Sequence, residues 1–320
     1  MFYYLNIEVS IKMHRPQNPP TAALHVASNP HCRIGENPLW HPTHRKLYWC
    51  DIPYGRLYAF NPETRATELL RDGADDGTLI GGFTIQHDGA LLLFMHNGRI
   101  DRWTPTSSQT LIAPHPDHAG MRFNDVIADP AGRVFCGTMP FAEPLDGTRP
   151  GNLYRLDHDG TLTPILTNVL CSNGLAFTRN ARHLFHTDSL RRTITRFDYD
   201  LATGTLSRPV PFITTHEQDG LPDGLTIDAE GHLWSAHWGG HCIIRYTPDG
   251  REQSRIALPT SRVSSLTFGG DDLCTLFITT ATEEPPATHV LDGALFMTHL
   301  STQGAPEFPS RIAPEFVSTS

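Results

Sequence analysis

Side chains that carry carbonyl or carboxylate oxygens recur at one position of a repeated sequence segment. Six copies begin 41 to 50 residues apart, at Glu36, Gly81, Asn124, Asn173, Asp223 and Ser264. Asn and Asp also begin strands because they form local turns, so one such residue alone indicates little. Four oxygen donors at an equivalent position indicate more, since oxygen ligands suit hard cations such as Ca²⁺, Mg²⁺ and Mn²⁺. If the six positions converge in space, they predict a cation site.

The elements around these positions predict how they converge. Each copy has alternating apolar residues, a turn rich in Gly, Pro or Asp, and a second apolar run, as in 223–227, 228–231 and 232–236. This is a strand and hairpin pattern, and a repeat of about 40–50 residues is the length of a propeller blade. We therefore predict an all-β, six-bladed β-propeller with a central metal site. The first strand of each blade lines the channel, and two carboxylates buried there are costly unless a cation lies between them.

The ends of the chain predict how the ring closes. The sixth copy has three evident strands, at 264–269, 275–280 and 293–299. An open edge invites aggregation, so we expect Ala22–Ala27 to supply the fourth strand by pairing near 294–300. No linker divides the chain, which predicts one domain over residues 21–320. Residues 1–20 are expected to be an N-terminal extension, with Met1 and Met13 both possible starts.

Composition excludes several classes of partner. The net charge of −9 comes without a Lys/Arg cluster, and nucleic-acid binding needs a basic surface. No run of eighteen apolar residues suggests a membrane span, and the start lacks the pattern of a signal peptide. The six cysteines are scattered without a CxxC pair, which indicates free thiols in a reducing compartment. We therefore expect a cytoplasmic protein with no obligate protein partner.

Several short motifs, taken in order, resemble one known family. The chain is similar to regucalcin, gluconolactonase and the bacterial arabinono- and xylonolactonases, over about residues 30–300. One motif alone is weak, but the ordered set is specific. The motifs are GENPLW at 35–40, RFND at 122–125, GTM at 137–139, SNGL at 172–175, PDG at 222–224 and WGG at 238–240.

The resemblance implies a metal-dependent hydrolase that opens a sugar lactone to its aldonic acid in carbohydrate catabolism. It implies one divalent metal ion, with Ca²⁺, Zn²⁺, Mn²⁺, Mg²⁺ and Fe²⁺ as candidates, held by Glu36, Asn173 and Asp223. Asn124 would be a further ligand or a substrate contact, and Arg122 would bind the oxygens of the lactone.

The chain departs from the family pattern at two places. Val126 stands where the family often has Gly. Ala142 stands at the family's substrate-contacting Glu, with Glu143 one residue later. Whether Glu143 replaces that residue is left open by the sequence.

The expected mechanism uses Asp223 as the general base. A carboxylate beside a cation is ionised and can accept a proton from water, whereas Arg122 is a permanent cation and cannot be the base. No G-x-S-x-G elbow suggests a serine hydrolase. The two alternatives are a non-catalytic calcium-binding propeller and a related propeller esterase or phosphotriesterase.

The histidines offer a second reading of the metal chemistry. The pairs His115/His118 and His237/His241 could suggest zinc, but they lie in a predicted loop and strand-turn, where exposed or packed roles are expected. We expect His186 to have a structural hydrogen-bond role.

Overall fold

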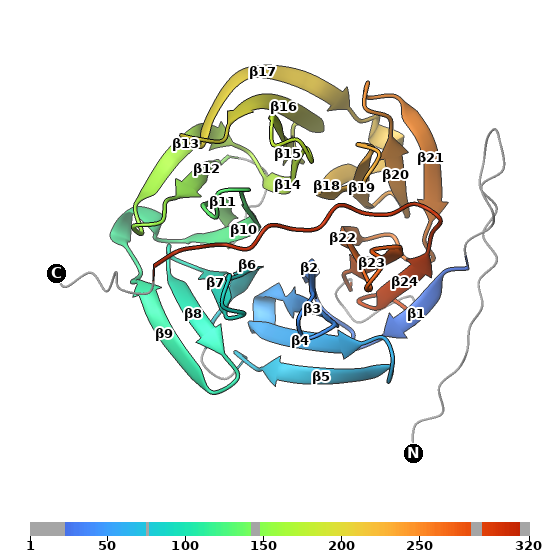
Figure 1. Cartoon of the computed structure of the whole chain (residues 1–320), viewed down its shortest axis with the longest axis horizontal. Coiled ribbons are helices and arrows are strands. Elements are labelled where there is room, and N and C mark those ends of the chain that lie inside the picture. Colours follow the sequence, from blue (N-terminus) through green and yellow to red (C-terminus); the bar gives the residue numbers. More distant parts are fainter. Residues whose placement is uncertain (1–22, 75–76, 142–147, 283–289, 314–320) are drawn as a thin grey trace.

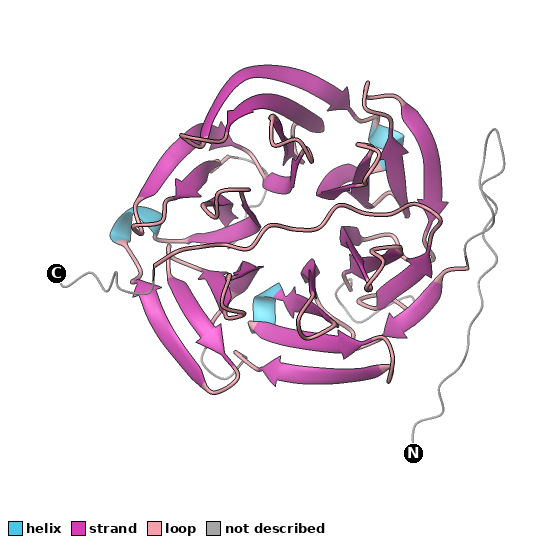
Figure 2. Ribbon diagram, viewed as in Figure 1, coloured by secondary structure: helices cyan, strands magenta, loops and turns pink. Residues whose placement is uncertain are grey.

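The computed structural model describes residues 23–74, 77–141, 148–282 and 290–313. These residues form six four-stranded antiparallel sheets arranged in a ring around one axis (Figures 1 and 2). The all-β, six-bladed propeller predicted from the repeat is confirmed. The only helices in this part of the chain are the 3₁₀ turns η1 (Ile52–Tyr54), η2 (Pro116–His118) and η3 (Glu217–Asp219). None of them has the length or apolarity to cross a membrane.

Each blade runs from an inner strand at the channel to an outer strand at the rim. Blades one to three are β2 (Gly35–His41), β3 (Lys46–Asp51), β4 (Arg56–Asn61) and β5 (Ala66–Arg71); β6 (Ile80–Ile85), β7 (Leu91–Met95), β8 (Ile100–Thr104) and β9 (Ser107–Ile112); β10 (Met121–Ala128), β11 (Val134–Pro140), β12 (Gly151–Leu156) and β13 (Leu162–Val169). Blades four to six are β14 (Ser172–Phe177), β15 (His183–Asp188), β16 (Thr193–Asp200) and β17 (Thr205–Thr214); β18 (Leu221–Ile227), β19 (Leu233–Trp238), β20 (Cys242–Tyr246) and β21 (Glu252–Ala257); β22 (Val263–Gly269), β23 (Thr275–Thr280), β24 (Leu295–His299) and β1 (His25–Ser28).

The hydrophobic core lies between neighbouring blades. One cluster joins Tyr48 of blade one to Phe83 and Leu93 of blade two, and another joins Trp234 of blade five to Phe268 of blade six. Both faces of the middle strands are therefore buried, which explains their nearly continuous apolar sequence. Burial on both faces fixes the ring, because each blade covers the apolar face of the next.

The N-terminal strand closes the ring. β1 pairs antiparallel with β24, with His25 opposite Met297 and Val26 opposite Phe296. The predicted closing strand is thus confirmed over His25–Ala27, and the observed strand extends one residue further, to Ser28. The predicted extension at residues 1–20 and the alternative starts lie outside the described residues.

A second closure was not predicted. After β24 the chain crosses the face of the ring to the blades opposite (Figure 1, red). We call residues 301–313 the strap. At its start, the backbone of Ala305 donates to Ile227 of blade five. At its end, Ser310 donates to Ile85 of blade two and Arg311 donates to Gly132 of blade three.

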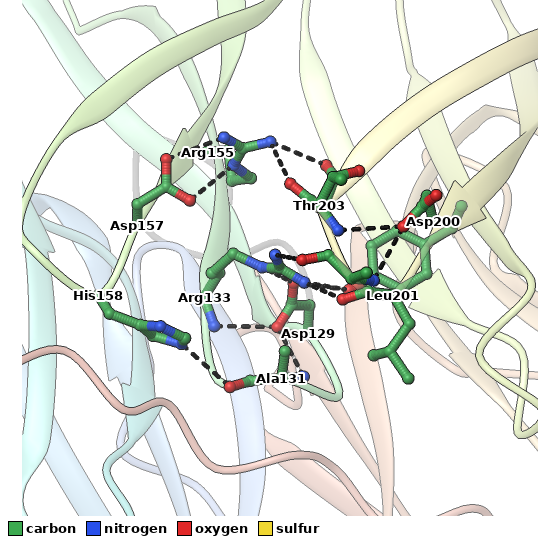
Figure 3. Close-up of polar contacts among 12 residues, drawn as sticks. Asp129, Ala131, Arg133, Arg155, Asp157, His158, Asp200, Leu201 and Thr203 are labelled. Carbon is green, nitrogen blue, oxygen red and sulfur yellow. Dashed lines mark hydrogen bonds and ion pairs between the residues drawn. The ribbon is translucent and has the colours of Figure 1, made fainter.

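Polar side chains form hydrogen bonds between neighbouring blades at the end of the ring that the strap crosses. Figure 3 shows Asp129 and Arg133 of blade three against the hairpin at 200–204 of blade four. The Asp129 carboxylate accepts hydrogen bonds from Arg133 Nε at 2.6 Å and from the Tyr199 hydroxyl at 2.7 Å. Arg133 also donates to the carbonyl of Leu201 at 2.6 Å. This buried ion pair is fully bonded, so it is a structural feature rather than a candidate site.

Candidate active site

One cavity of about 210 Å³ holds all the residues singled out from the sequence as metal-binding, catalytic or substrate-binding. It lies at the end of the channel where the inner strands begin. The strap bonds to the other end, where β6 and β18 finish. The lining residues are Ile34, Glu36, Ile52, Arg122, Asn124, Met139, Cys171, Asn173, Ser189, Leu190, Leu221, Asp223 and Trp238.

The strand register breaks at each of the three proposed metal ligands, Glu36, Asn173 and Asp223. The pairing of β2 shifts between Glu36 and Leu39, and that of β14 shifts between Asn173 and Leu175. The pairing of β18 shifts between Pro222 and Leu225, around Asp223. The other three inner strands shift at the equivalent position. Such bulges disrupt the ladder locally and re-aim a side chain, so the repeat places a bulge, and not only a strand, at every lead position.

Glycines after two of the site residues allow the inner strands to approach closely. A Cβ at Gly174 would lie 2.3 Å from the carbonyl oxygen of Asp223, and a Cβ at Gly224 would lie 2.2 Å from Ser265 Oγ. No side chain fits at these distances. The Gly in the Asn-Gly and Asp-Gly motifs therefore brings the oxygen donors of neighbouring blades together.

Glu36 and Asp223 are buried carboxylates with too few protein partners. Burial, followed by their mutual repulsion and that of Asp125, raises the pKa of Asp223 well above its usual range. Burial likewise raises the pKa of Glu36. Asp223 Oδ1 is buried without a hydrogen-bond partner among the described residues, whereas Glu36 Oε2 accepts the Asn37 N–H at 2.9 Å. An unpartnered carboxylate oxygen beside a second acid and an amide oxygen suits a hard divalent cation.

Arg122, Asn124 and Asn173 form a connected set of polar groups beside the two acids. Arg122 Nη1 donates to Asn124 Oδ1, and Asn124 Nδ2 donates to Asn173 Oδ1. Asn124 Nδ2 also donates to the carbonyl of Ser172 at 2.8 Å. Burial lowers the pKa of Arg122, and the thiol of Cys171 and the carboxylate of Glu36 oppose that shift. Among the described residues that line this cavity, Arg122 is the one with a cationic side chain, so its guanidinium can bind a substrate oxygen.

Two residues near the site were not predicted from the sequence. Asp125 follows Asn124 in β10 and lines a second cavity of about 410 Å³ beside the strap, and burial raises its pKa. It stands in the RFND motif, so the motif could have indicated it. Ser189 bonds directly to Asn173, but it follows a second strand rather than an inner one. The repeat gave no signal for it.

Other residues that could bind a metal or support the site have the following surroundings. His186 Nε2 hydrogen-bonds Ser172 Oγ at 2.9 Å, and burial lowers the pKa of His186 to about 4, which fits the expected structural role. Within the described chain, one group of three His, Cys, Asp or Glu side chains lies close enough together to hold a metal ion, and it consists of Asp228, Glu230 and His232. Arg245 already pairs with both of those acids. Glu143 lies outside the described residues.

Comparisons with known proteins identify the family of this chain. The family model described as the SMP-30/Gluconolactonase/LRE-like region matches residues 34–282. The pentonolactonase XacC of Haloferax volcanii is 44% identical over 88% of this chain and 96% of its own length. Regucalcin of Sus scrofa is 30% identical over 87% of this chain and 95% of its own length.

A solved structure supports the fold. The calcium-binding protein regucalcin of Agrobacterium tumefaciens superposes with a TM-score of 0.81 over 90% of this chain and 97% of that chain, at 22% identity. Since the family model spans most of the sequence and the cavity holds the motif residues, the chain belongs to the SMP-30/gluconolactonase/LRE-like family.

Proposed function

We propose that the protein is a divalent-metal-dependent lactonase that hydrolyses a sugar lactone to its aldonic acid. The observation that carries this proposal is the convergence of Glu36, Asn173 and Asp223 beside Arg122 in one cavity, with Asp223 Oδ1 unpartnered. The lactonase relatives support the same reaction. A propeller alone would not, because one fold hosts many functions.

Glu36, Asn173 and Asp223 would hold the cation through their side-chain oxygens. Bound there, a divalent cation polarises a carbonyl and lowers the pKa of water. Two carboxylates and one amide give the ligand set two negative charges, which match a divalent ion. Ca²⁺, Mg²⁺, Mn²⁺, Zn²⁺ and Fe²⁺ remain the candidates, because ligand type alone does not separate them.

Asp223 is the proposed general base. Its carboxylate would take a proton from the attacking water as the new C–O bond forms at the lactone carbonyl. The same proton would pass to the ring oxygen as the ring C–O bond breaks, which leaves Asp223 ionised. Arg122 would hydrogen-bond the lactone oxygens throughout, since a guanidinium donates in a fixed geometry and keeps its charge. Asn124 would place Arg122 and add a polar contact to the substrate.

The proposed substrate class is a five-carbon aldonolactone. A relative with 44% identity is named a pentonolactonase. The apolar wall formed by Ile52, Leu190 and Trp238 suits the carbon skeleton of a compact ring. We place the reaction in carbohydrate catabolism. Six free cysteines, four of them buried, support a cytoplasmic location, because thiols stay reduced in the cytosol.

Calcium binding without catalysis is the second candidate, favoured by the regucalcin relatives. The distinguishing test measures acid release from a panel of pentono- and hexonolactones and a phosphotriester, with metal and with chelator. Metal-dependent turnover of a lactone supports the proposal. Stoichiometric calcium binding without turnover of any lactone would replace it with the second candidate, and preferred turnover of the phosphotriester would change the substrate class.

A further inference from the structure

A chain of hydrogen bonds runs across the site from blade three to blade five. It begins at Arg122 Nη1 and passes through the side-chain amides of Asn124 and Asn173. Asn173 Nδ2 then donates to Ser189 Oγ at 2.8 Å, and the Ser189 hydroxyl donates to the carbonyl of Pro222 at 2.6 Å. Each inner residue of the chain accepts one hydrogen bond and donates the next.

The two ends of the chain fix its direction. A guanidinium can only donate and a backbone carbonyl can only accept, so Arg122 and Pro222 leave one arrangement for the groups between them. Asn124 must turn Oδ1 to Arg122, and Asn173 must turn Oδ1 to Asn124. The opposite rotamer of the Asn173 amide would set its NH₂ group against that of Asn124, and the Ser189 hydroxyl would have to find a different donor.

We propose that Ser189 is a positioning residue that holds the Asn173 amide with its oxygen toward the axis, where the metal would bind. This inference rests on the proposed metal site. Ser189 is 3% exposed, so water cannot easily take the place of its hydroxyl. A buried NH₂ group without its acceptor costs free energy. Cys171 Sγ, at 3.6 Å from Asn173 Nδ2, is a weaker acceptor.

Ser189 also connects two of the proposed ligands. Its acceptor is the carbonyl of Pro222, the residue directly before Asp223. The hydroxyl thus joins the amide of Asn173 in blade four to the bulged start of β18 in blade five. Groups that orient a ligand in this way typically change metal affinity by about 10–100-fold when removed.

The test measures the dissociation constant for Mn²⁺ by titration calorimetry, independently of turnover. Ser189→Ala is expected to weaken binding by about 10–100-fold. The matched control is Ser235→Ala, whose buried hydroxyl bonds only the carbonyl of Ala236 in the described chain, and it should bind as the wild type does. Ser189→Thr, which keeps the hydroxyl, should stay within about threefold of the wild type and also guards against a folding defect in the alanine variant.

A double-mutant cycle separates positioning from a general loss of packing. Asn173→Asp keeps an oxygen ligand but has no NH₂ group to orient. In that background Ser189→Ala should have little additional effect on Mn²⁺ affinity. An unchanged dissociation constant in Ser189→Ala, a full additional loss in the double variant, or no Mn²⁺ binding by the wild type would each overturn the inference. If the variants change the Mn²⁺ dissociation constant as expected but the protein hydrolyses no lactone, only the proposed function is overturned.

Discussion

Two buried carboxylates, one at each end of the central channel, have opposite surroundings. Asp223 and Asp228 come from the same stretch of chain, at the start of β18 and just after its end, and they are 5% and 0% exposed. Asp228 accepts hydrogen bonds from Trp234 Nε1 at 3.0 Å and from Arg245 Nε at 2.9 Å. Asp223 Oδ1 has no partner in the described chain. Two acids five positions apart in the chain thus differ in role, one structural and the other proposed to be functional.

Asp129, which also lies at the strap end, is bonded in the same way as Asp228. At the strap end, Asp129 is bonded to Arg133 and Tyr199, and the strap itself pairs with four blades. At the other end, Asp223 Oδ1 has no partner in the described chain, and the cavity is lined by the starts of the inner strands. A fully bonded group stabilises the fold, whereas an unsatisfied buried group costs stability. The difference indicates that Asp129 and Asp228 stabilise the fold, whereas Asp223 is available to a ligand.

The largest effect is expected from Asp223→Asn. This change keeps an oxygen and the shape of the side chain but removes the negative charge and the basicity. At saturating metal, kcat should stay about 10²–10⁴-fold below the wild type, the usual span for a general base. Asn173→Ala weakens the ligand set without removing a base, so excess metal should restore its activity further.

The measurement is kcat against metal concentration, with bound metal counted directly. Full recovery of Asp223→Asn at saturating metal would remove Asp223 as the base. The contrast between the channel ends would then rest on metal binding alone.

At the strap end, Arg133→Ala should reduce stability and leave chemistry intact. The change leaves the Asp129 carboxylate, which is 0% exposed, without its ionic partner. Removing one partner of a buried ion pair costs roughly 3–5 kcal/mol. Urea unfolding should show this loss, while kcat/KM at 25 °C stays near the wild-type value. Loss of activity in a folded Arg133→Ala protein would show that the two ends are coupled.

Arg122→Ala is expected to lower kcat/KM by about 10–150-fold, which corresponds to one charge-assisted hydrogen bond of roughly 1.5–3 kcal/mol. Metal content should remain unchanged, because Ser189 and the carbonyl of Pro222 still hold the Asn173 amide. Both quantities are measured on the same preparation. Loss of metal together with activity would assign Arg122 to the support of Asn124 and Asn173 instead.

The smallest effect is a pH dependence of metal stabilisation. In the metal-free protein burial raises the pKa of Glu36 and Asp223. Their contribution to stability is therefore complete below about pH 4, near the unfolded values, and is lost as pH rises through the folded values. Metal binding needs the ionised forms, so the cation opposes this loss. The Tm difference between metal-loaded and chelated protein should grow from pH 5 to pH 8, and a constant difference would contradict the assignment of these ligands.

Much of the fold and of the candidate site could be predicted because the same sequence segment recurs in every blade. The 41–50-residue spacing of the lead positions predicts six blades and the convergence of Glu36, Asn124, Asn173 and Asp223, since equivalent positions of a closed ring must meet. The missing strand of the sixth copy predicts closure by the N-terminal strand, which β1 and β24 confirm. Each of these predictions follows from a local period and the requirement that no sheet edge stay open.

The features that only the tertiary structure decided depend on contacts that do not recur from one sequence repeat to the next. The strap bonds to blades that are distant in sequence, and Ser189 follows a second strand rather than an inner one. The sequence placed Asp223 at a lead position and Asp228 in the turn that follows, but it did not show which carboxylate would be left without a partner. Their difference depends on whether Arg245 and Trp234, from neighbouring strands, reach the carboxylate. Residue type and spacing determined where the oxygens gather, but the choice between a bonded acid and an unsatisfied one depends on partners that only the folded chain brings within reach.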